Sequence, residues 1–182
     1  MVEEASRQSP LSDYIVNVPD YPKTGIIFKD ITPLLADARA LKRSIVGLAE
    51  RLNSQGIDQI AGIEARGFIL GAAVAAEMGL GFIPLRKPGK SPREVHSVRY
   101  QLEYGFDELQ VHKDLIEGDM KIAIIDDVLA TGGTAVAAID LIEKAGALVK
   151  GFGCLLELEF LNGRKAIKSK YPGVPVEALV KQ

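Results

Sequence analysis

An apolar run that ends in two adjacent acids constrains this chain most strongly. In KIAIIDDVLATGGT, residues 121–134, the run leads into Asp126 and Asp127 and then into a turn of small and hydroxyl residues. Apolar residues then recur at helical spacing. The pattern predicts a buried strand over 121–128, a tight turn, and an amphipathic helix over 133–145.

The same alternation of apolar strands and helices recurs along the chain. Strands are expected over residues 60–63, 80–87 and 149–158, and helices over 35–52 and 67–78. This order is typical of an α/β fold in which helices cover a mostly parallel sheet. In such folds ligands bind at the carboxyl ends of the strands, so the turn after residue 128 becomes a candidate site.

Two segments fall outside this alternation. Residues 18–33 hold three prolines and show no clear period, so we expect an irregular cap within a small N-terminal hood of about residues 1–34. Residues 89–114 are rich in charged residues with only weak alternation, which indicates a flexible hairpin or long loop suited to act as a lid. With no evident linker, the chain 1–182 is expected to be a single domain.

Composition narrows the classes of partner. A formal net charge of -2 argues against nucleic acid, because phosphate backbones are held by clusters of Lys and Arg. Cys154 is the only cysteine, so no intramolecular disulfide is possible, and metal-finger spacing is absent. With no secretory signal pattern and no apolar run of membrane-spanning length, we expect a cytoplasmic protein that does not bind membranes.

The turn after the two acids has the composition of a phosphate site. Backbone N–H groups at the start of the predicted helix favour an anion. Gly132 and Gly133 lack the Cβ atoms that would block close approach, and Thr131 and Thr134 offer hydroxyl donors. The turn is therefore predicted to hold a phosphate group through five residues: Ala130, Thr131, Gly132, Gly133 and Thr134.

The two acids need a different partner. Ionised carboxylates only accept hydrogen bonds, so Asp126 and Asp127 suit hydroxyl groups and cations rather than phosphate. A ligand with a phosphate at one end and a vicinal diol a few ångströms away satisfies both halves, and ribose 5-phosphate is such a ligand. Each half alone is also compatible with an ordinary capped turn. Their combination between a strand and a helix favours the binding interpretation.

Two other nucleotide-binding motifs fit poorly. Gly62 and Gly67 have the glycine spacing of a P-loop, but Phe68 and Ile69 stand where Lys and Ser or Thr are required. No GxGxxG pattern opens a helix. An NTPase or a dinucleotide-dependent oxidoreductase is therefore disfavoured.

Four motifs together resemble the type I phosphoribosyltransferases. IIDDVLATGGT is similar to that family's signature for phosphoribosyl diphosphate (PRPP), and GIEARGF, IPLRKPGK and YQLEYG resemble, in that order, the adenine phosphoribosyltransferases. The resemblance spans about residues 21–163. It implies the type I phosphoribosyltransferase fold and, in purine salvage, transfer of the 5-phosphoribosyl group from PRPP to adenine, which gives AMP and pyrophosphate. It also implies dependence on Mg²⁺ and a homodimer.

The resemblance assigns roles along PRPP. The turn would hold the 5-phosphate and Asp126 and Asp127 would face the ribose hydroxyls, with Mg²⁺ carried by PRPP near these acids and no direct protein ligand. The pyrophosphate group needs positive charge, and basic residues follow the two strands before the lid, whose carboxyl ends we expect side by side. These residues are Arg66, Arg86, Lys87 and Lys90. A solvated basic rim is a fair alternative for Lys90, and in the family a dimer partner also contributes basic residues, which makes Lys87 a candidate for the neighbouring subunit.

Catalytic residues are also implied by the resemblance. Glu103 and Tyr104, in YQLEYG, match lid residues near the reacting base, and with Arg66 they form the predicted catalytic set. Without the resemblance, Glu103 is an ordinary exposed glutamate. His96 and Arg99 of the same segment receive no role.

The adenine pocket is expected to use two distant segments. In TGIIFKD, Phe28 would stack on the base while the backbone at Ile27 and Lys29 reads its amino edge, and Leu158 would form the opposing wall. Phe28 and Leu158 are also compatible with plain core positions.

Three alternatives remain open. In the first, the enzyme acts on hypoxanthine, xanthine or guanine instead of adenine. In the second, the chain is a PRPP-binding regulator without catalysis, and in the third it is a generic nucleotide-binding α/β domain. Release of pyrophosphate from PRPP with adenine separates an enzyme from the two binding proteins, and turnover with each base separates adenine from the oxo-purines.

Overall fold

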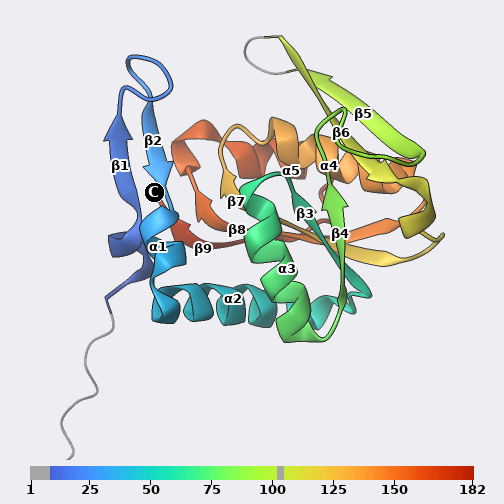
Figure 1. Cartoon of the computed structure of the whole chain (residues 1–182), viewed down its shortest axis with the longest axis horizontal. Helices are drawn as coiled ribbons and strands as arrows, with labels where there is room; N and C mark the ends of the chain where they lie inside the picture. The colour runs from blue at the N-terminus through green and yellow to red at the C-terminus, as the bar shows by residue number, and fades with distance from the viewer. Residues whose placement is uncertain (1–8, 102–104) are drawn as a thin grey trace, which may run out of the picture. The chain divides into compact units, whose positions relative to one another are not determined.

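A five-stranded parallel sheet organises the larger part of the chain. The computed structural model describes residues 9–101 and 105–182, and its contacts divide the chain into two units, Met1–Ser44 and Ile45–Gln182. In the larger unit the strand order is β4-β3-β7-β8-β9, and every neighbouring pair is parallel (Figure 1). The predicted α/β fold with a central parallel sheet is confirmed. The strands are β3 (Gln59–Ile63), β4 (Gly81–Leu85), β7 (Lys121–Leu129), β8 (Leu148–Glu157) and β9 (Val176–Lys181).

The strand order contains a switch point. From β3 the chain passes to β4 on one side and later returns to β7 on the other side of β3. At such a reversal the connections leave a crevice outside the carboxyl ends of the two neighbouring strands, here β3 and β7. The fold therefore places the loop after β3 and the turn after β7 at one edge of the sheet.

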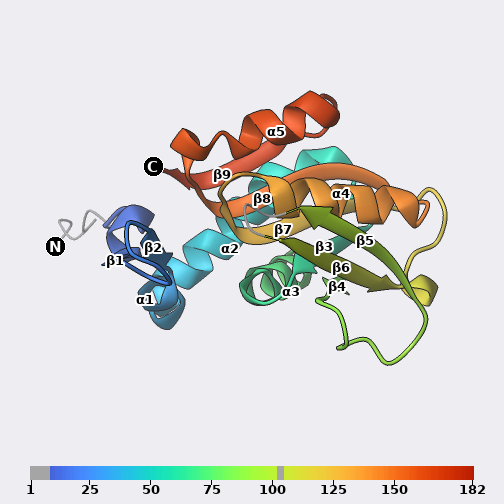
Figure 2. The same cartoon turned by 90° about the horizontal axis from the view of Figure 1, so that it is seen from above.

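Helices cover both faces of this sheet. Figure 2 shows α3 (Arg66–Met78) on one face and α4 (Gly133–Lys144) with α5 (Gly163–Lys170) on the other. α4 contributes Ile139 and Ile142 to an apolar cluster that includes Ile122 and Ile124 of β7, all four fully buried. Among the described residues, no helix is long and apolar enough to cross a membrane.

The segment predicted as a flexible hairpin or loop contains a hairpin. β5 (Val95–Gln101) pairs antiparallel with β6 (Phe106–His112), and Val98 lies opposite Leu109. Leu109 and Val111 are buried in the same apolar cluster as α4. A flexible lid over residues 89–114 stays a prediction. Movement of the whole hairpin would expose Leu109 and Val111 to water, so a lid motion that keeps the core buried is limited to the part beyond these residues.

The N-terminal unit differs from the predicted irregular cap. β1 (Val16–Pro19) and β2 (Ile27–Asp30) form an antiparallel hairpin. Gly25 adopts a left-handed φ of +86° in the connection, and its N–H donates to Asp20 Oδ1 at 2.7 Å. The prediction of irregular structure over residues 18–33 is wrong for these strands, because a proline is tolerated at the end of an edge strand. That the chain is a single functional domain with an N-terminal hood over about residues 1–34 stays a prediction.

The helix predicted over residues 35–52 is two helices. α1 (Thr32–Ala36) is followed by Asp37, whose backbone is extended, and α2 (Ala38–Leu52) begins after it. Asp37 Oδ1 accepts the N–H groups of Arg39 at 3.0 Å and Ala40 at 2.8 Å, the bonding pattern of an N-terminal cap. Apolar spacing does not reveal a break that a single capping residue creates.

We expect Asp37→Ala to lower the free energy of unfolding by about 1 kcal/mol, because two N–H groups of α2 lose their acceptor. Urea unfolding measures the change. Asp37→Asn keeps an acceptor oxygen and should lose less than half as much; equal losses in the two variants would show that the cap bonds contribute little.

Candidate functional site

Two neighbouring carboxylates, Asp126 and Asp127, lie near the carboxyl end of β7. Asp127 is 6% exposed and Asp126 is half-buried, and Asp126 Oδ1 accepts the N–H of Asp127 at 2.9 Å. Removal from water and the adjacent Asp127 carboxylate raise the pKa of Asp126 well above its usual range. A partner that hydrogen-bonds or neutralises these groups is therefore favoured at this position.

An ion pair joins the start of α3 to β7. Arg66 is the first residue of α3, one position earlier than the sequence predicts for this helix, and its Nε lies 2.7 Å from Asp127 Oδ2. The arginine side chain is 39% exposed, whereas that of Asp127 is 9% exposed. The guanidinium therefore neutralises a nearly buried carboxylate and still reaches solvent.

The turn after β7 presents the start of a helix to the same edge. Gly132 is the N-cap of α4, and no side-chain bond caps the helix there. The first N–H groups of an α-helix have no acceptor within the helix. Thr131 is exposed and Thr134 is half-buried, so hydroxyl and backbone donors are available together, as an anion site requires.

Glycine is needed at position 132 and leaves open space at position 133, for different structural reasons. Gly132 has φ +86°, and a Cβ there would lie 2.7 Å from the carbonyl oxygen of Gly163. The packing is reciprocal, since a Cβ on Gly163 would lie 2.3 Å from the carbonyl oxygen of Ala130. A Cβ on Gly133 would meet nothing closer than 3.8 Å. Gly132 is thus required for packing against α5, whereas Gly133 leaves space in front of the helix start.

One carboxylate that the sequence analysis did not single out gathers the basic residues after β4. Glu64 Oε1 bonds Lys90 Nζ, while Oε2 accepts the N–H of Lys87 at 2.8 Å and lies 3.8 Å from Arg86 Nε. Burial would raise the pKa of Glu64, but its bonds from Lys90 and Lys87 and the charge of Arg86 outweigh burial and lower it. Its place in GIEARGF, directly after an apolar strand, was the available signal.

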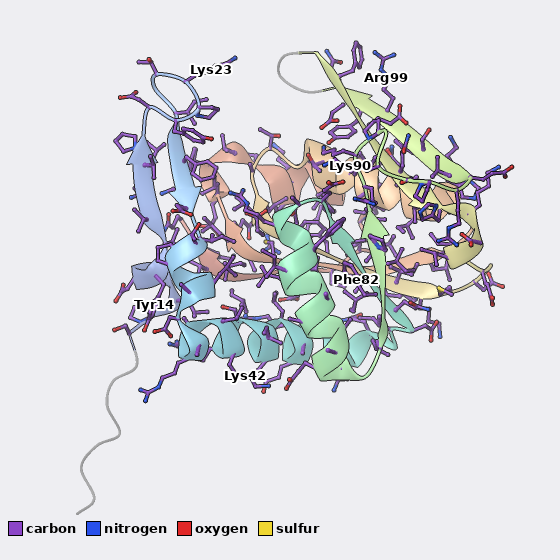
Figure 3. All side chains as sticks on the ribbon, in the orientation of Figure 1. Tyr14, Lys23, Lys42, Phe82, Lys90 and Arg99 are labelled. Carbon is purple, nitrogen blue, oxygen red and sulfur yellow. The ribbon has the colours of Figure 1, made fainter. Side chains whose placement is uncertain are left out.

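The side chain of Lys87 turns away from this carboxylate. Lys87 Nζ donates to Asp107 Oδ2 and, at 3.0 Å, to Tyr100 Oη, both on the hairpin. Arg86 and Lys90 meet at Glu64, near the carboxyl edge of the sheet where Figure 3 labels Lys90. The four predicted pyrophosphate residues therefore form three separate groups, of which Arg66 with Asp127 is the third.

The residues predicted to bind adenine fall in different units. Ile27, Phe28 and Lys29 lie on β2 of the N-terminal unit, where the Phe28 ring meets Tyr21 edge-on with centroids 5.2 Å apart. Leu158 follows β8 in the larger unit and is 8% exposed. Each unit has its own described structure, so a shared base pocket stays a prediction.

The predicted lid residues Glu103 and Tyr104 lie outside the described residues. Arg99 and Phe106 nearby form a cation–π contact with the guanidinium 4.6 Å from the ring centroid, near the end of β5 where Figure 3 labels Arg99. This gives Arg99 a structural role that the sequence did not reveal. His96 is half-buried opposite Val111.

The acids at the crevice suit a metal ion that arrives with its own ligands. Within residues 9–101 and 105–182, no group of three or more His, Cys, Asp or Glu side chains could hold a metal ion. Asp126 and Asp127 are the carboxylates at the turn, and Arg66 already neutralises one of them. Mg²⁺ usually keeps several waters and binds substrate phosphates, so two carboxylates near the phosphates suit a Mg²⁺ that PRPP carries without a direct protein ligand.

Comparison with known proteins agrees with this geometry. The pattern of the phosphoribosyl transferase domain matches residues 34–172. The chain belongs to the phosphoribosyl transferase family. Among curated members, the adenine phosphoribosyltransferase of Francisella philomiragia subsp. philomiragia is 55% identical over 173 residues, which cover 94% of this chain and 97% of that protein. The family resemblance seen in the sequence is confirmed.

Solved structures of phosphoribosyl transferase family members share the fold. The adenine phosphoribosyltransferase of Thermoanaerobacter pseudethanolicus superposes with a TM-score of 0.89 at 47% identity, over 94% of this chain and 98% of that one. The APRTase of Giardia lamblia, solved in complex with 9-deazaadenine, gives a TM-score of 0.88 at 34% identity, over 95% and 98% of the two chains. The predicted type I phosphoribosyltransferase fold is confirmed.

We expect Gly132→Ala to destabilise the protein by about 1–3 kcal/mol, because a left-handed residue gains a Cβ against the Gly163 carbonyl. Gly133→Ala should change the stability by less than about 0.5 kcal/mol, since space is available. Thermal unfolding of the two variants measures the contrast. Equal melting temperatures would show that Gly132 is not held against α5.

Proposed function

We propose that this chain is an adenine phosphoribosyltransferase that transfers the 5-phosphoribosyl group from PRPP to adenine, releasing pyrophosphate and giving AMP in purine salvage. The observation that carries the proposal is the edge of the sheet at which Asp126, Asp127, Arg66 and the turn 130–134 meet. The close relatives named above bear out the enzyme class that the sequence resemblance implies.

The sugar end of the donor is assigned to β7 and α4. The backbone donors and hydroxyls of residues 130–134 bind the 5-phosphate, and the carboxylates of Asp126 and Asp127 accept hydrogen bonds from the ribose hydroxyls. Partial burial favours this use, because a carboxylate with a raised pKa gains when hydroxyl donors bind it. The two acids and the phosphate turn thus form two halves of one grip on the donor.

The leaving group is assigned to the basic residues at the crevice. The bond from C1 of the ribose to the pyrophosphate oxygen breaks while a bond from C1 to a purine nitrogen forms, and negative charge develops on pyrophosphate. Arg66, Arg86, Lys87 and Lys90 supply positive charge to the phosphates of PRPP. Mg²⁺, carried by PRPP with Asp126 and Asp127 nearby, supplies further positive charge to the leaving group when bound. Glu64 holds Arg86 and Lys90 in place for this role.

The base and the proton are assigned to residues whose joint position is a proposal. Phe28 stacks on adenine, the backbone of Ile27 and Lys29 reads its amino edge, and Leu158 closes the opposite side. The complex of the Giardia enzyme with 9-deazaadenine supports an adenine-shaped pocket in the family. Glu103 and Tyr104, with Arg66, are kept as the catalytic set: Glu103 accepts the proton that the purine nitrogen loses as its bond to C1 forms. The predicted lid over residues 89–114 would exclude water from the reacting sugar.

The assembly is proposed to be a homodimer in the cytoplasm. Ile69 is 49% exposed on α3, and Ala72 and Ala76, one and two turns further along the helix, are exposed as well. A helix face of this composition suits burial against a second copy of the chain. The cytoplasmic location rests on the single cysteine and stays a prediction.

The activity is tested by pyrophosphate release from PRPP with Mg²⁺ and adenine. We expect release with adenine, and at least about a hundredfold lower kcat/KM with hypoxanthine, xanthine or guanine, because a site built to hydrogen-bond one edge leaves its polar groups unpaired with the wrong base. No release with any base would favour a PRPP-binding regulator or a generic nucleotide-binding domain. Equal turnover with an oxo-purine would contradict the preference for adenine.

Asp126→Asn should weaken PRPP binding and at the same time raise the melting temperature at pH 7 by a few degrees. The folded protein has a raised pKa for Asp126, so the ionised carboxylate costs stability above the pKa of the unfolded chain. This cost grows as the pH rises toward the folded pKa and is constant beyond it. The stability gain should therefore vanish in acid. Thermal unfolding against pH and titration with ribose 5-phosphate measure the two effects; a variant less stable than its parent at pH 7 would contradict the stability half.

A further inference from the structure

The inward face of the hairpin changes from apolar to polar toward its tip. Val98 lies opposite Leu109, and two residues further along Tyr100 lies opposite Asp107. The ring of Tyr100 packs against the apolar cluster that contains Leu109. Asp107 is half-buried on this face, where a carboxylate requires hydrogen bonds or a counter-charge.

The hydroxyl of Tyr100 joins three elements of the fold. It donates to Asp107 Oδ2 at 3.0 Å, it accepts from Lys87 Nζ at 3.0 Å, and it lies 3.4 Å from Thr134 Oγ1. A phenolic hydroxyl has one donor and two acceptor sites, so it can serve Asp107 and Lys87 at the same time. One oxygen atom therefore connects the hairpin, the loop after β4 and the phosphate turn.

Asp107 fixes both the charge and the direction of the Lys87 side chain. Burial alone would lower the pKa of Lys87, but the bonds to Asp107 and Tyr100 outweigh burial and raise it. Burial is likewise outweighed at Asp107, whose pKa falls because of Lys87. An ammonium group has three donors, of which Asp107 and Tyr100 take two. Lys87 is thus held as a cation with capacity for one more acceptor.

We propose that Tyr100 and Asp107 are positioning residues that hold the Lys87 ammonium beside the 5-phosphate turn, where its third donor binds a phosphate oxygen of PRPP. The inference rests on the proposed function, because it takes PRPP as the ligand of that turn. It assigns Lys87 to the site of its own chain, through the hydroxyl that also lies against Thr134.

A second set of the same chemistry provides a matched control. Between α4 and α5, Tyr171 Oη bonds Asp140 Oδ1, and Lys170 Nζ lies 2.6 and 2.8 Å from the two Asp140 oxygens. Lys170 lies 5.5 Å from the Tyr171 ring centroid, the same distance as Lys87 from that of Tyr100. This second set contains no residue assigned to the site.

The test compares Tyr100→Phe with Tyr171→Phe. Calorimetry of PRPP binding without adenine should show a Kd about three- to tenfold higher for Tyr100→Phe, and the KM for PRPP should rise by the same factor. The KM for adenine should stay within twofold. Tyr171→Phe should leave all three constants within twofold of the parent, although it likewise removes a tyrosine–aspartate hydrogen bond.

Asp107→Asn provides a second, independent variant. It keeps the shape of the side chain but removes the counter-charge of Lys87, and it should raise the Kd for PRPP as Tyr100→Phe does. The Kd of the double variant for PRPP should be about equal to that of the weaker-binding single variant, because both changes release the same ammonium group. If Tyr100→Phe fails to fold, Asp107→Asn decides.

The outcomes separate this inference from the proposed activity. Unchanged PRPP binding in Tyr100→Phe and Asp107→Asn, or an equal change in Tyr171→Phe, would overturn the positioning role. A parent protein that binds PRPP but releases no pyrophosphate with adenine would refute the activity, and the comparison of Kd values would still decide the inference. A parent that binds no PRPP would overturn both.

Discussion

The parallel pairing of β3 with β7 is the constraint on which the site depends. Their register sets Gly62 opposite Ile125, so β3 ends level with the two acids of β7. Gly67 then lets α3 begin directly beside β7, because a Cβ there would lie 2.9 Å from the Ile125 carbonyl oxygen. Arg66 is carried to Asp127 by this close approach. A slip of one residue in the pairing would exchange the faces to which Asp126 and Asp127 point and separate the ion pair.

Charge at this edge is arranged in local pairs rather than as a broad basic patch. Asp127 pairs with Arg66, and Glu64 pairs with Lys90 and lies near Arg86. On the hairpin, Asp107 pairs with Lys87. Lys90 is 52% exposed, so its pair contributes little to stability. Each pair fixes the direction of its cation, which in the proposed function lowers the reorganisation that binding of PRPP requires. This arrangement is compatible with a net charge of only -2.

The sequence predicts what periodicity and local chemistry encode. The strand and helix around the phosphate turn follow from their apolar spacing, and the switch-point site follows from the order of elements. The break at Asp37 and the hairpin β1–β2 were missed because single caps and short edge strands leave no period. The elements α5 and β9 were not predicted either; α5 has eight residues and only Ile167 as a large buried side chain. Glu64 was missed because its role depends on residues more than twenty positions away.

Residue type alone does not decide which polar clusters matter for function. The Lys–Asp–Tyr sets around Asp107 and Asp140 have the same chemistry, yet only the first lies between the loop after β4 and the phosphate turn. The hydrogen bonds at Asp140 connect α4 to the end of α5 and thereby stabilise the packing of these two helices. Position relative to the switch point, which the topology fixes, is therefore what separates a positioning cluster from a structural one. The same reasoning separates Gly132 from Gly133, since the first faces α5 and the second faces the space in front of the helix.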